Sequence, residues 1–183
     1  GADDLFDVSS LCALLGGTDD AVSLALCVGD DFGAVCNNAH AEKKGKLTLY
    51  DGDPTETAIF FAAHSSGINV YTLAEKYPRI HENPFSGERK MMSTVNMIDA
   101  EKQLTVKGAP DIVIGKCNFI DINGKITPLT AARKKKISEQ NNNMAQDALR
   151  VIAVAYRKAG EDYSEENLIF AGLIGMTDPP RPE

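Results

Sequence analysis

Two stretches near the end of the chain decide the fold: Leu149-Arg-Val-Ile-Ala-Val-Ala-Tyr156 and Leu168-Ile-Phe-Ala-Gly-Leu-Ile-Gly175. Both are almost continuously apolar and lack the alternation of a strand that has one face in water. Runs of this kind are typical of strands in the middle of a sheet that is covered on both faces. We therefore expect a central sheet with other elements packed on each side.

The middle of the chain predicts more strands, and these should pair in an antiparallel way. The segments 79–85, 89–98 and 102–107 have strand character, and Asp99-Ala100-Glu101 forms a turn between the last two. Asn123-Gly124 is a hairpin signal between the segments 119–122 and 125–129. A further short strand is expected at Leu47 to Leu49.

Helix start signals lie between these strands. Asp53-Pro-Thr-Glu56 combines a capping residue, a proline in the first turn and a glutamate three residues later, and this helix should end near Gly67. Thr130 should cap a polar helix that reaches Asp147. Other helical segments are expected at 18–28, 70–77 and 109–117. The prediction is one α+β domain with a mostly antiparallel central sheet of about six to seven strands flanked by helices.

Composition excludes several classes of function. The chain has 183 residues, 43% of them hydrophobic, and its apolar runs are far shorter than a membrane span. A net charge of −7 argues against a broad nucleic-acid surface, and we interpret the basic run 133–136 as a solvated helix face. The four cysteines and three histidines have no metal-ligand spacing, so no metal site is expected and the thiols should be packing residues.

General catalytic signatures are missing, with one exception. The sequence has no Gly-x-x-x-x-Gly-Lys-Ser/Thr loop, no Gly-x-Gly-x-x-Gly turn and no Gly-x-Ser-x-Gly elbow. Asp51-Gly-Asp53-Pro-Thr55 follows a short strand and resembles the nucleophile motif of haloacid-dehalogenase-type phosphatases. In the alternative interpretation, Asp53 simply caps the helix that begins at Pro54.

Five blocks of sequence, in order, resemble the P-type ATPase family, which pumps cations. They span about 130 residues, and their order is difficult to obtain by chance. The blocks are Asp53-Pro-Thr-Glu-Thr-Ala58, Phe85-Ser-Gly-Glu-Arg-Lys-Met-Met-Ser93, Lys107-Gly-Ala-Pro-Asp111, Ala148-Leu-Arg-Val-Ile-Ala153 and Gly172-Leu-Ile-Gly-Met-Thr-Asp-Pro-Pro-Arg181.

The resemblance implies an ATP-binding domain over residues 1–177, inserted in a phosphorylation domain. Residues 178–183 would begin the hinge that returns to that domain, with Asp178, Pro179, Pro180 and Arg181 fixing its geometry. The family's phosphorylated aspartate and its magnesium-binding motifs do not occur in this sequence, so no catalytic residue is expected here. The implied partners are ATP or ADP and the phosphorylation and actuator domains of the same polypeptide, in the cytoplasmic part of a membrane protein, with Mg²⁺ bound mainly outside this segment.

The resemblance also implies roles for single residues. Phe85 would stack on adenine and Glu56 would accept a hydrogen bond from the adenine amino group. Lys107, Gly108 and Ala109 would form the floor of the pocket, and Arg150 would contact phosphate. Arg89 and Lys90 add positive charge near Phe85, and the sequence leaves open which of them faces the nucleotide.

Ion specificity and two other functions stay open. The heavy-metal branch of the family carries a His-Pro pair in this domain, whereas His40, His64 and His81 are followed by Ala, Ser and Glu. The calcium, sodium/potassium and proton branches fit better, and a bacterial-type calcium pump is the first expectation. The alternatives are a phosphatase that uses Asp51 and Asp53, or a non-catalytic interaction domain.

Overall fold

A computed structural model describes residues 12–15, 30–65 and 67–176 of the chain. The described strands form a large sheet in the order β4-β5-β6-β9-β10-β7-β8, with β1 also paired to β10, and a separate two-stranded sheet of β2 and β3. The strands of the large sheet are β1 (Cys12–Leu15), β4 (Arg79–Ser86), β5 (Met91–Ile98), β6 (Glu101–Gly108), β7 (Cys117–Ile122), β8 (Lys125–Pro128), β9 (Arg150–Lys158) and β10 (Leu168–Met176).

The two apolar runs occupy the middle of this sheet, as expected. The β9 strand pairs with β6 on one side and with β10 on the other, both in the antiparallel direction. The β10 strand pairs in parallel with β7 through its first half and with β1 through its second half. All other pairings among the described strands are antiparallel, which confirms the predicted mostly antiparallel α+β class.

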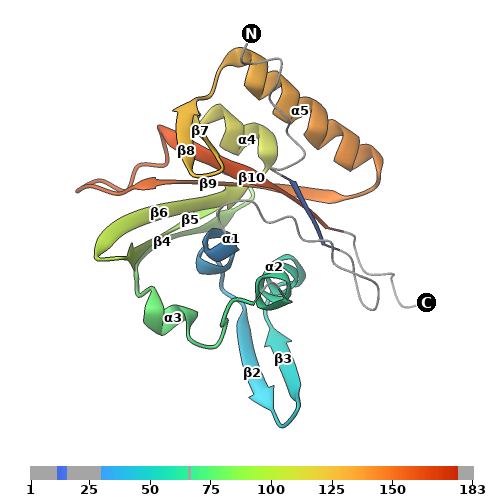
Figure 1. The fold of residues 1–183 in the computed structure, drawn as a ribbon, viewed down its shortest axis with the longest axis vertical. Helices are drawn as coiled ribbons and strands as arrows, with labels where there is room; N and C mark the ends of the chain where they lie inside the picture. Colours follow the sequence, from blue (N-terminus) through green and yellow to red (C-terminus); the bar gives the residue numbers. More distant parts are fainter. Residues whose placement is uncertain (1–11, 16–29, 66, 177–183) are drawn as a thin grey trace.

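Helices cover both faces of the sheet. In Figure 1, α4 and α5 lie on one side, and α1, α2 and α3 lie on the other. This arrangement explains why β9 and β10 have few polar residues, because both of their faces are removed from water. The bounds are α1 (Asp30–Val35), α2 (Pro54–Ser65), α3 (Leu73–Lys76), α4 (Pro110–Gly115) and α5 (Ala131–Gln146).

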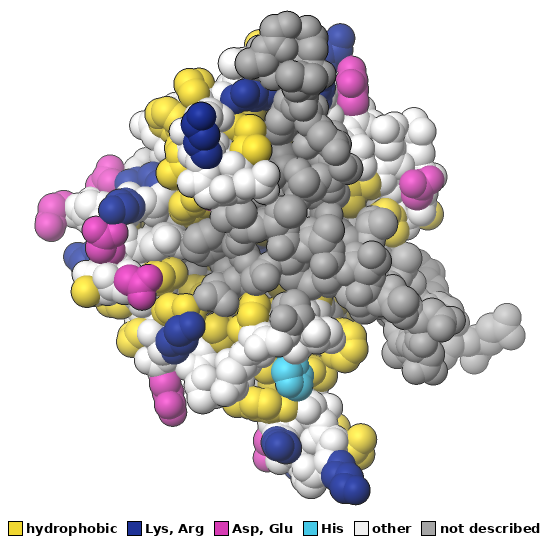
Figure 2. Space-filling model, viewed as in Figure 1, with side chains coloured by type: hydrophobic (Ala, Val, Ile, Leu, Met, Phe, Trp, Pro, Cys, Tyr) yellow, Lys and Arg dark blue, Asp and Glu magenta, His cyan; other side chains and the backbone are white. Residues whose placement is uncertain are grey.

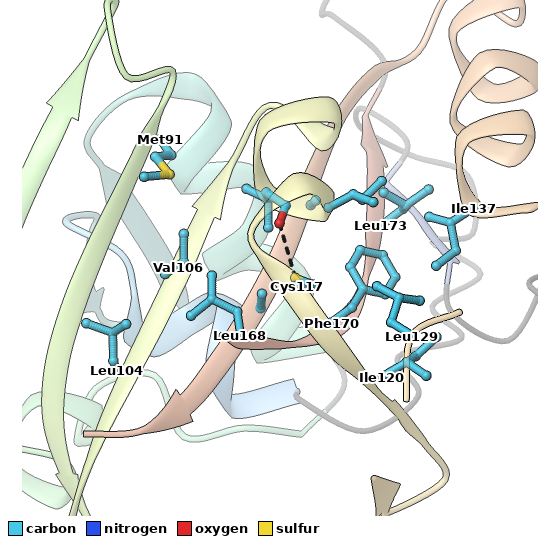
Figure 3. Packing of buried hydrophobic residues seen from close by; sticks show 14 of the residues in the cluster. Met91, Leu104, Val106, Cys117, Ile120, Leu129, Ile137, Leu168, Phe170 and Leu173 are labelled. Carbon is cyan, nitrogen blue, oxygen red and sulfur yellow. Dashed lines mark hydrogen bonds between the residues drawn. The ribbon is translucent and has the colours of Figure 1, made fainter. Parts of the chain in front are cut away.

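The main hydrophobic core lies between the sheet and α4 and α5. Figure 3 shows Phe170 of β10 packed among side chains of β7, α5 and the segment that follows β8. Cys117 is fully buried in this core and donates from Sγ to the carbonyl oxygen of Val113 at 3.1 Å. Burial raises its pKa to about 12, so this thiol is a packing residue, as predicted.

Two smaller cores hold the opposite layer in place. Ile59 and Ala62 of α2 pack against Val154 of β9 and Ala171 of β10. A second cluster joins α1, α2 and α3 to one another, and it contains Phe60, Val70, Leu73 and Tyr77 among others. The α2 helix is thus fixed to the centre of the sheet, and its first turn has a defined position there.

The β2 and β3 strands form a hairpin that extends from this layer. The pattern at Leu47 predicted β3 (Leu47–Asp51), but β2 (His40–Lys44) was missed because its sequence is mostly charged. Leu47 is 70% exposed, and Figure 2 shows Lys or Arg and hydrophobic side chains at the end of the hairpin. At its base, the Tyr50 hydroxyl and His64 Nδ1 of α2 are 2.5 Å apart.

Most local predictions are confirmed. Asp53 Oδ1 accepts a hydrogen bond from the Thr55 amide at 2.9 Å, and Thr130 Oγ1 accepts from the Arg133 amide. Asn123 and Gly124 both have positive φ, as a two-residue hairpin turn requires. The helix expected at 70–77 is wrong in extent, because only α3 is helical, and the helix expected at 18–28 lies outside the described residues.

Within residues 12–15, 30–65 and 67–176, no helix combines the length and apolar character needed to cross a membrane.

Gly108 ends β6 at a point where the backbone of β5 comes very close. A Cβ atom at this position would lie 2.5 Å from the carbonyl oxygen of Lys90 and 2.7 Å from Cα of Met91. These neighbours are main-chain atoms or lie next to the main chain, so they cannot move aside without distorting the strand pair. The glycine is therefore required by the fold.

We predict that Gly108→Ala lowers the free energy of unfolding by about 1–3 kcal/mol because of this overpacking. Gly87→Ala is the matched control, since a Cβ at Gly87 meets nothing within 4 Å. Chemical denaturation of both variants measures the effect. Equal stability of the two variants would contradict the close approach at Gly108.

Candidate functional site

The first turn of α2 and the end of β6 are joined by an ion pair. Lys107 Nζ lies 2.7 Å from Glu56 Oε1, and the two side chains are only 8% and 15% exposed. A lysine that is buried to this extent is stable in its charged form only with such a partner. The sequence predicted both residues for one site, and the structure brings them into direct contact.

The segment after α1 donates hydrogen bonds to Glu56. The Asn38 amide donates to Glu56 Oε1 at 3.3 Å, and Asn37 Nδ2 donates to the Glu56 carbonyl oxygen at 2.9 Å. Cys36 lies fully buried beside this pair, and burial raises its pKa although the charge of Lys107 lowers it. Cys36 is therefore an inert packing thiol, and the Glu56 carboxylate has a fixed direction.

Arg150 reaches the same helix end from β9. Its Nη1 donates to Thr55 Oγ1 at 2.9 Å, so Thr55 and Glu56 of α2 contact two different strands of the sheet. Arg150 is exposed, unlike Lys107. Arg150 therefore lies at the solvent-exposed edge of the arrangement.

The register of the sheet places Gly108 between these groups and the corner where β4 turns into β5 (residues 83–93), the β4–β5 corner. Gly108 pairs with Met91 of β5, and Met91 pairs with Ser86 of β4. Because neighbouring strands are about 4.8 Å apart, Ser86 and Gly108 are separated by roughly 10 Å. The Ala109 amide donates to the Lys90 carbonyl oxygen at 2.9 Å, which fixes the start of α4 to the same corner.

Phe85 lies next to this line of residues and is 62% exposed, which is unusual for a phenylalanine. It belongs to the edge strand β4, whose register with β5 shifts between Asn83 and Ser86. Such a bulge redirects side chains, and the neighbouring Pro84 is tolerated because it lies at an edge. The bulge accounts for a large ring that is directed to solvent at the edge of the sheet.

At this corner the two adjacent basic residues, Arg89 and Lys90, point in different directions. Arg89 forms an ion pair with Glu165, and its Nη1 donates to the Pro84 carbonyl oxygen at 3.1 Å. Lys90 is exposed and has a φ of 55°, which is a left-handed conformation. In this structure the Arg89 side chain is directed to protein groups, while Lys90 is directed to solvent.

The structure thus gathers the predicted site residues from four elements. The first turn of α2 is the meeting point of Glu56, Lys107 and Arg150, where Lys107 contacts Glu56 directly and Arg150 contacts Thr55. Between this turn and the corner that carries Phe85 lie Gly108 and Ala109. Sequence reasoning missed the contributions of Asn38 and Glu165, and no local signal indicates them. The predicted hinge residues 178–181 lie outside the described residues.

The arrangement is suited to holding a ligand. The exposed residues of this arrangement are Phe85, Lys90 and Arg150, whereas Lys107 and Glu56 are largely buried and paired with each other. Among the described residues, no group of three or more histidine, cysteine or carboxylate side chains could hold a metal ion. Asp53 caps α2, and Asp51 ends the exposed β3 strand, which is unlike a buried phosphatase nucleophile.

Comparison with known proteins shows which family the chain belongs to. The family model "P-type ATPase, cytoplasmic domain N" matches residues 31–183. The chain is 39% identical over 153 residues to calcium-transporting ATPase 1 of Lactococcus lactis, with 80% of this chain and 17% of that protein covered. It is 40% identical over 159 residues to a calcium-transporting ATPase of Bacillus subtilis, with 83% and 18% covered.

A similar relative from a eukaryote is the calcium-transporting ATPase PAT1 of Dictyostelium discoideum. It is 38% identical over 159 residues, which cover 82% of this chain and 14% of that protein. The chain spans less than a fifth of the length of these curated relatives. The matched region includes every described site residue, and the chain belongs to the family of P-type ATPase cytoplasmic N domains.

Proposed function

We propose that this domain binds ATP through its adenosine part and delivers the γ-phosphate to a phosphorylatable aspartate of a neighbouring domain, within a cation-transporting ATPase that is most simply a calcium pump. The observation that supports the proposal best is the buried Glu56–Lys107 pair at the end of β6, in the same sheet whose edge strand carries an exposed Phe85. The relatives that are named calcium-transporting ATPases support the ion assignment.

The adenine ring would lie against Phe85. Base stacking on an aromatic ring contributes about 1–3 kcal/mol, and a ring that is 62% exposed has a face available for it. Glu56 would accept a hydrogen bond from the adenine amino group, while Lys107 neutralises the carboxylate and donates to a ring nitrogen. Because Glu56 Oε1 already accepts from Lys107, the amino group would use the remaining acceptor capacity of the carboxylate.

The phosphates would extend toward the cations at the rim of the site. Arg150 presents a planar guanidinium that can contact two phosphate oxygens, and its bond to Thr55 fixes one end of the fork. Lys90 is the better candidate of the two adjacent basic residues, since Arg89 is engaged by Glu165 and Pro84. The γ-phosphate would then project away from the domain.

Delivery of that phosphate requires the rest of the pump. Residues 1–177 would form the nucleotide domain, and the segment from Asp178 to Arg181 would act as the hinge to the phosphorylation domain. Binding energy at Phe85 and Glu56 would position the substrate, and the nucleophile and most of the Mg²⁺ ligands would come from outside this chain. The actuator domain of the same polypeptide is a further expected partner, and the domain would lie on the cytoplasmic side of the membrane.

The 183-residue chain should bind ATP and ADP with similar affinity, because the proposed contacts are mainly to adenosine. A few such contacts give about 4–5 kcal/mol, which is a dissociation constant on the order of 0.1–1 mM. NMR titration with each nucleotide measures it. Submicromolar binding or a strong preference for GTP would contradict the site.

Phe85→Ala should weaken ATP binding by about 1–3 kcal/mol through the loss of stacking. Thermal stability should hardly change, because the ring is mostly exposed. Phe170→Ala is the matched control, since Phe170 is fully buried and its truncation should cost about 3–5 kcal/mol of stability. A Phe85→Ala protein with normal affinity would refute the stacking role.

The chain alone should not hydrolyse ATP, with or without Mg²⁺ and at saturating nucleotide. Phosphoryl transfer needs an in-line nucleophile and cations around the γ-phosphate. A phosphate-release assay on the chain and on Asp51→Asn tests this expectation. Steady turnover that is abolished by Asp51→Asn would favour the phosphatase interpretation instead.

A further inference from the structure

We propose that Glu165 is a positioning residue for Phe85: by holding Arg89, it fixes the corner between β4 and β5 that presents the ring. This inference rests on the proposed function, because it assigns Glu165 a role in nucleotide affinity. Glu165 lies in the segment 159–167 that joins β9 to β10, far in sequence from Phe85.

One carboxylate oxygen of Glu165 holds three parts of the corner together. Its Oε1 accepts from Ser93 Oγ of β5 at 2.5 Å, from Asn83 Nδ2 of β4 at 3.5 Å, and from Arg89 Nη2 in the turn. The Glu165 side chain is only 13% exposed. A carboxylate buried to this degree needs these donors, so its position and theirs are interdependent.

Arg89 then contacts the residues on both sides of Phe85, the backbone of Pro84 and the side chain of Ser86. Its Nη1 donates to the Pro84 carbonyl oxygen at 3.1 Å, and its amide donates to Ser86 Oγ at 3.2 Å. The bulge between Asn83 and Ser86 removes ladder bonds over this part of the edge strand. The Arg89 contacts therefore take the place of regular strand pairing next to the ring.

Phe85 has little else to fix its direction. At 62% exposure it lacks the packing that would hold a core phenylalanine. A ring that stacks on a base must already lie in the right plane, because ordering it on binding costs affinity. The contacts of Arg89 with Pro84 and Ser86, here called the clamp, hold the two neighbours of Phe85 and so order the ring without covering its face.

The segment that carries Glu165 is itself attached to the sheet. Arg157 of β9 donates from Nε and Nη2 to the Ser164 carbonyl oxygen at 2.9 and 2.7 Å. The Tyr163 ring lies 5.0 Å from the ring of His81 of β4. Glu165 is thus supported by β9 and β4, and the clamp connects the edge strand to the centre of the sheet.

The test compares Glu165→Ala with Glu166→Ala in the 183-residue chain. Glu166 is the adjacent glutamate and is also ion-paired, with Lys116 Nζ at 2.5 Å, but its side chain is 58% exposed and its partner precedes β7, away from the β4–β5 corner. ATP affinity is measured by NMR titration, and folding is checked from the amide spectrum. We expect Glu165→Ala to weaken ATP binding about three- to tenfold, and Glu166→Ala to leave it unchanged.

A double-mutant cycle separates positioning from a general loss of structure. In a Phe85→Ala background, Glu165→Ala should cause no further loss of ATP affinity, because the residue acts through the ring. Glu165→Gln, which keeps an acceptor for Ser93 and Arg89, should lie between wild type and Glu165→Ala. Equal weakening by Glu165→Ala with and without the Phe85 ring would overturn the proposal.

The same cycle distinguishes failure of this inference from failure of the proposed function. If Phe85→Ala weakens binding but Glu165→Ala does not, the positioning role is wrong and the stacking site remains. If neither substitution changes the affinity for ATP, the adenine site itself is wrong. If Glu165→Ala does not fold, the test uses Glu165→Gln and Arg89→Ala. Unchanged ATP affinity in both of these variants would also overturn the proposed positioning role of Glu165.

Discussion

The ion pair between Glu56 and Lys107 is the interaction on which the candidate site depends. It joins the first turn of α2 to the end of β6 in a position where both side chains are almost removed from water. Removing one member of such a pair leaves the other charge buried, at a cost of about 3–5 kcal/mol. A nucleotide that contacts either residue therefore meets a pair that is already in place. Substitution of Glu56 or Lys107 alone would lower the stability of the fold as well as the affinity for nucleotide, so the two effects could not be separated.

Gly108 shows how closely fold and site overlap at this place. The resemblance to P-type ATPases implies that a residue without a side chain lets the base approach, yet the strand pair already excludes a side chain there, since a Cβ would lie 2.5 Å from the Lys90 carbonyl oxygen. Packing alone thus accounts for the glycine. The exposed Phe85 is the opposite case, because the packing of the domain gives no reason for an aromatic ring there.

The elements that the sequence predicted well are those with local signals. Asp53 and Thr130 cap their helices, Asn123-Gly124 turns the hairpin, and the apolar runs form the two central strands, because propensity, capping and burial agree at these positions. The missed β2 strand has a sequence dominated by charge and stands largely in solvent, so its pairing with β3 leaves no periodic apolar pattern. Motif resemblance named the site residues, but their contacts across the sheet follow from register, which local patterns do not encode.

Glu165 illustrates why the supporting residues of a site escape sequence reasoning. It lies in a polar segment with charged neighbours, where a glutamate normally indicates only a solvated surface. Its significance comes from three donors that are 72 to 82 residues away in sequence and converge on one oxygen atom. Such convergence is possible because the segment between β9 and β10 reaches both β5 and the edge strand β4. A long-range contact of this kind holds a local corner in place, and in the role proposed for Glu165 that corner sets the direction of an exposed aromatic ring.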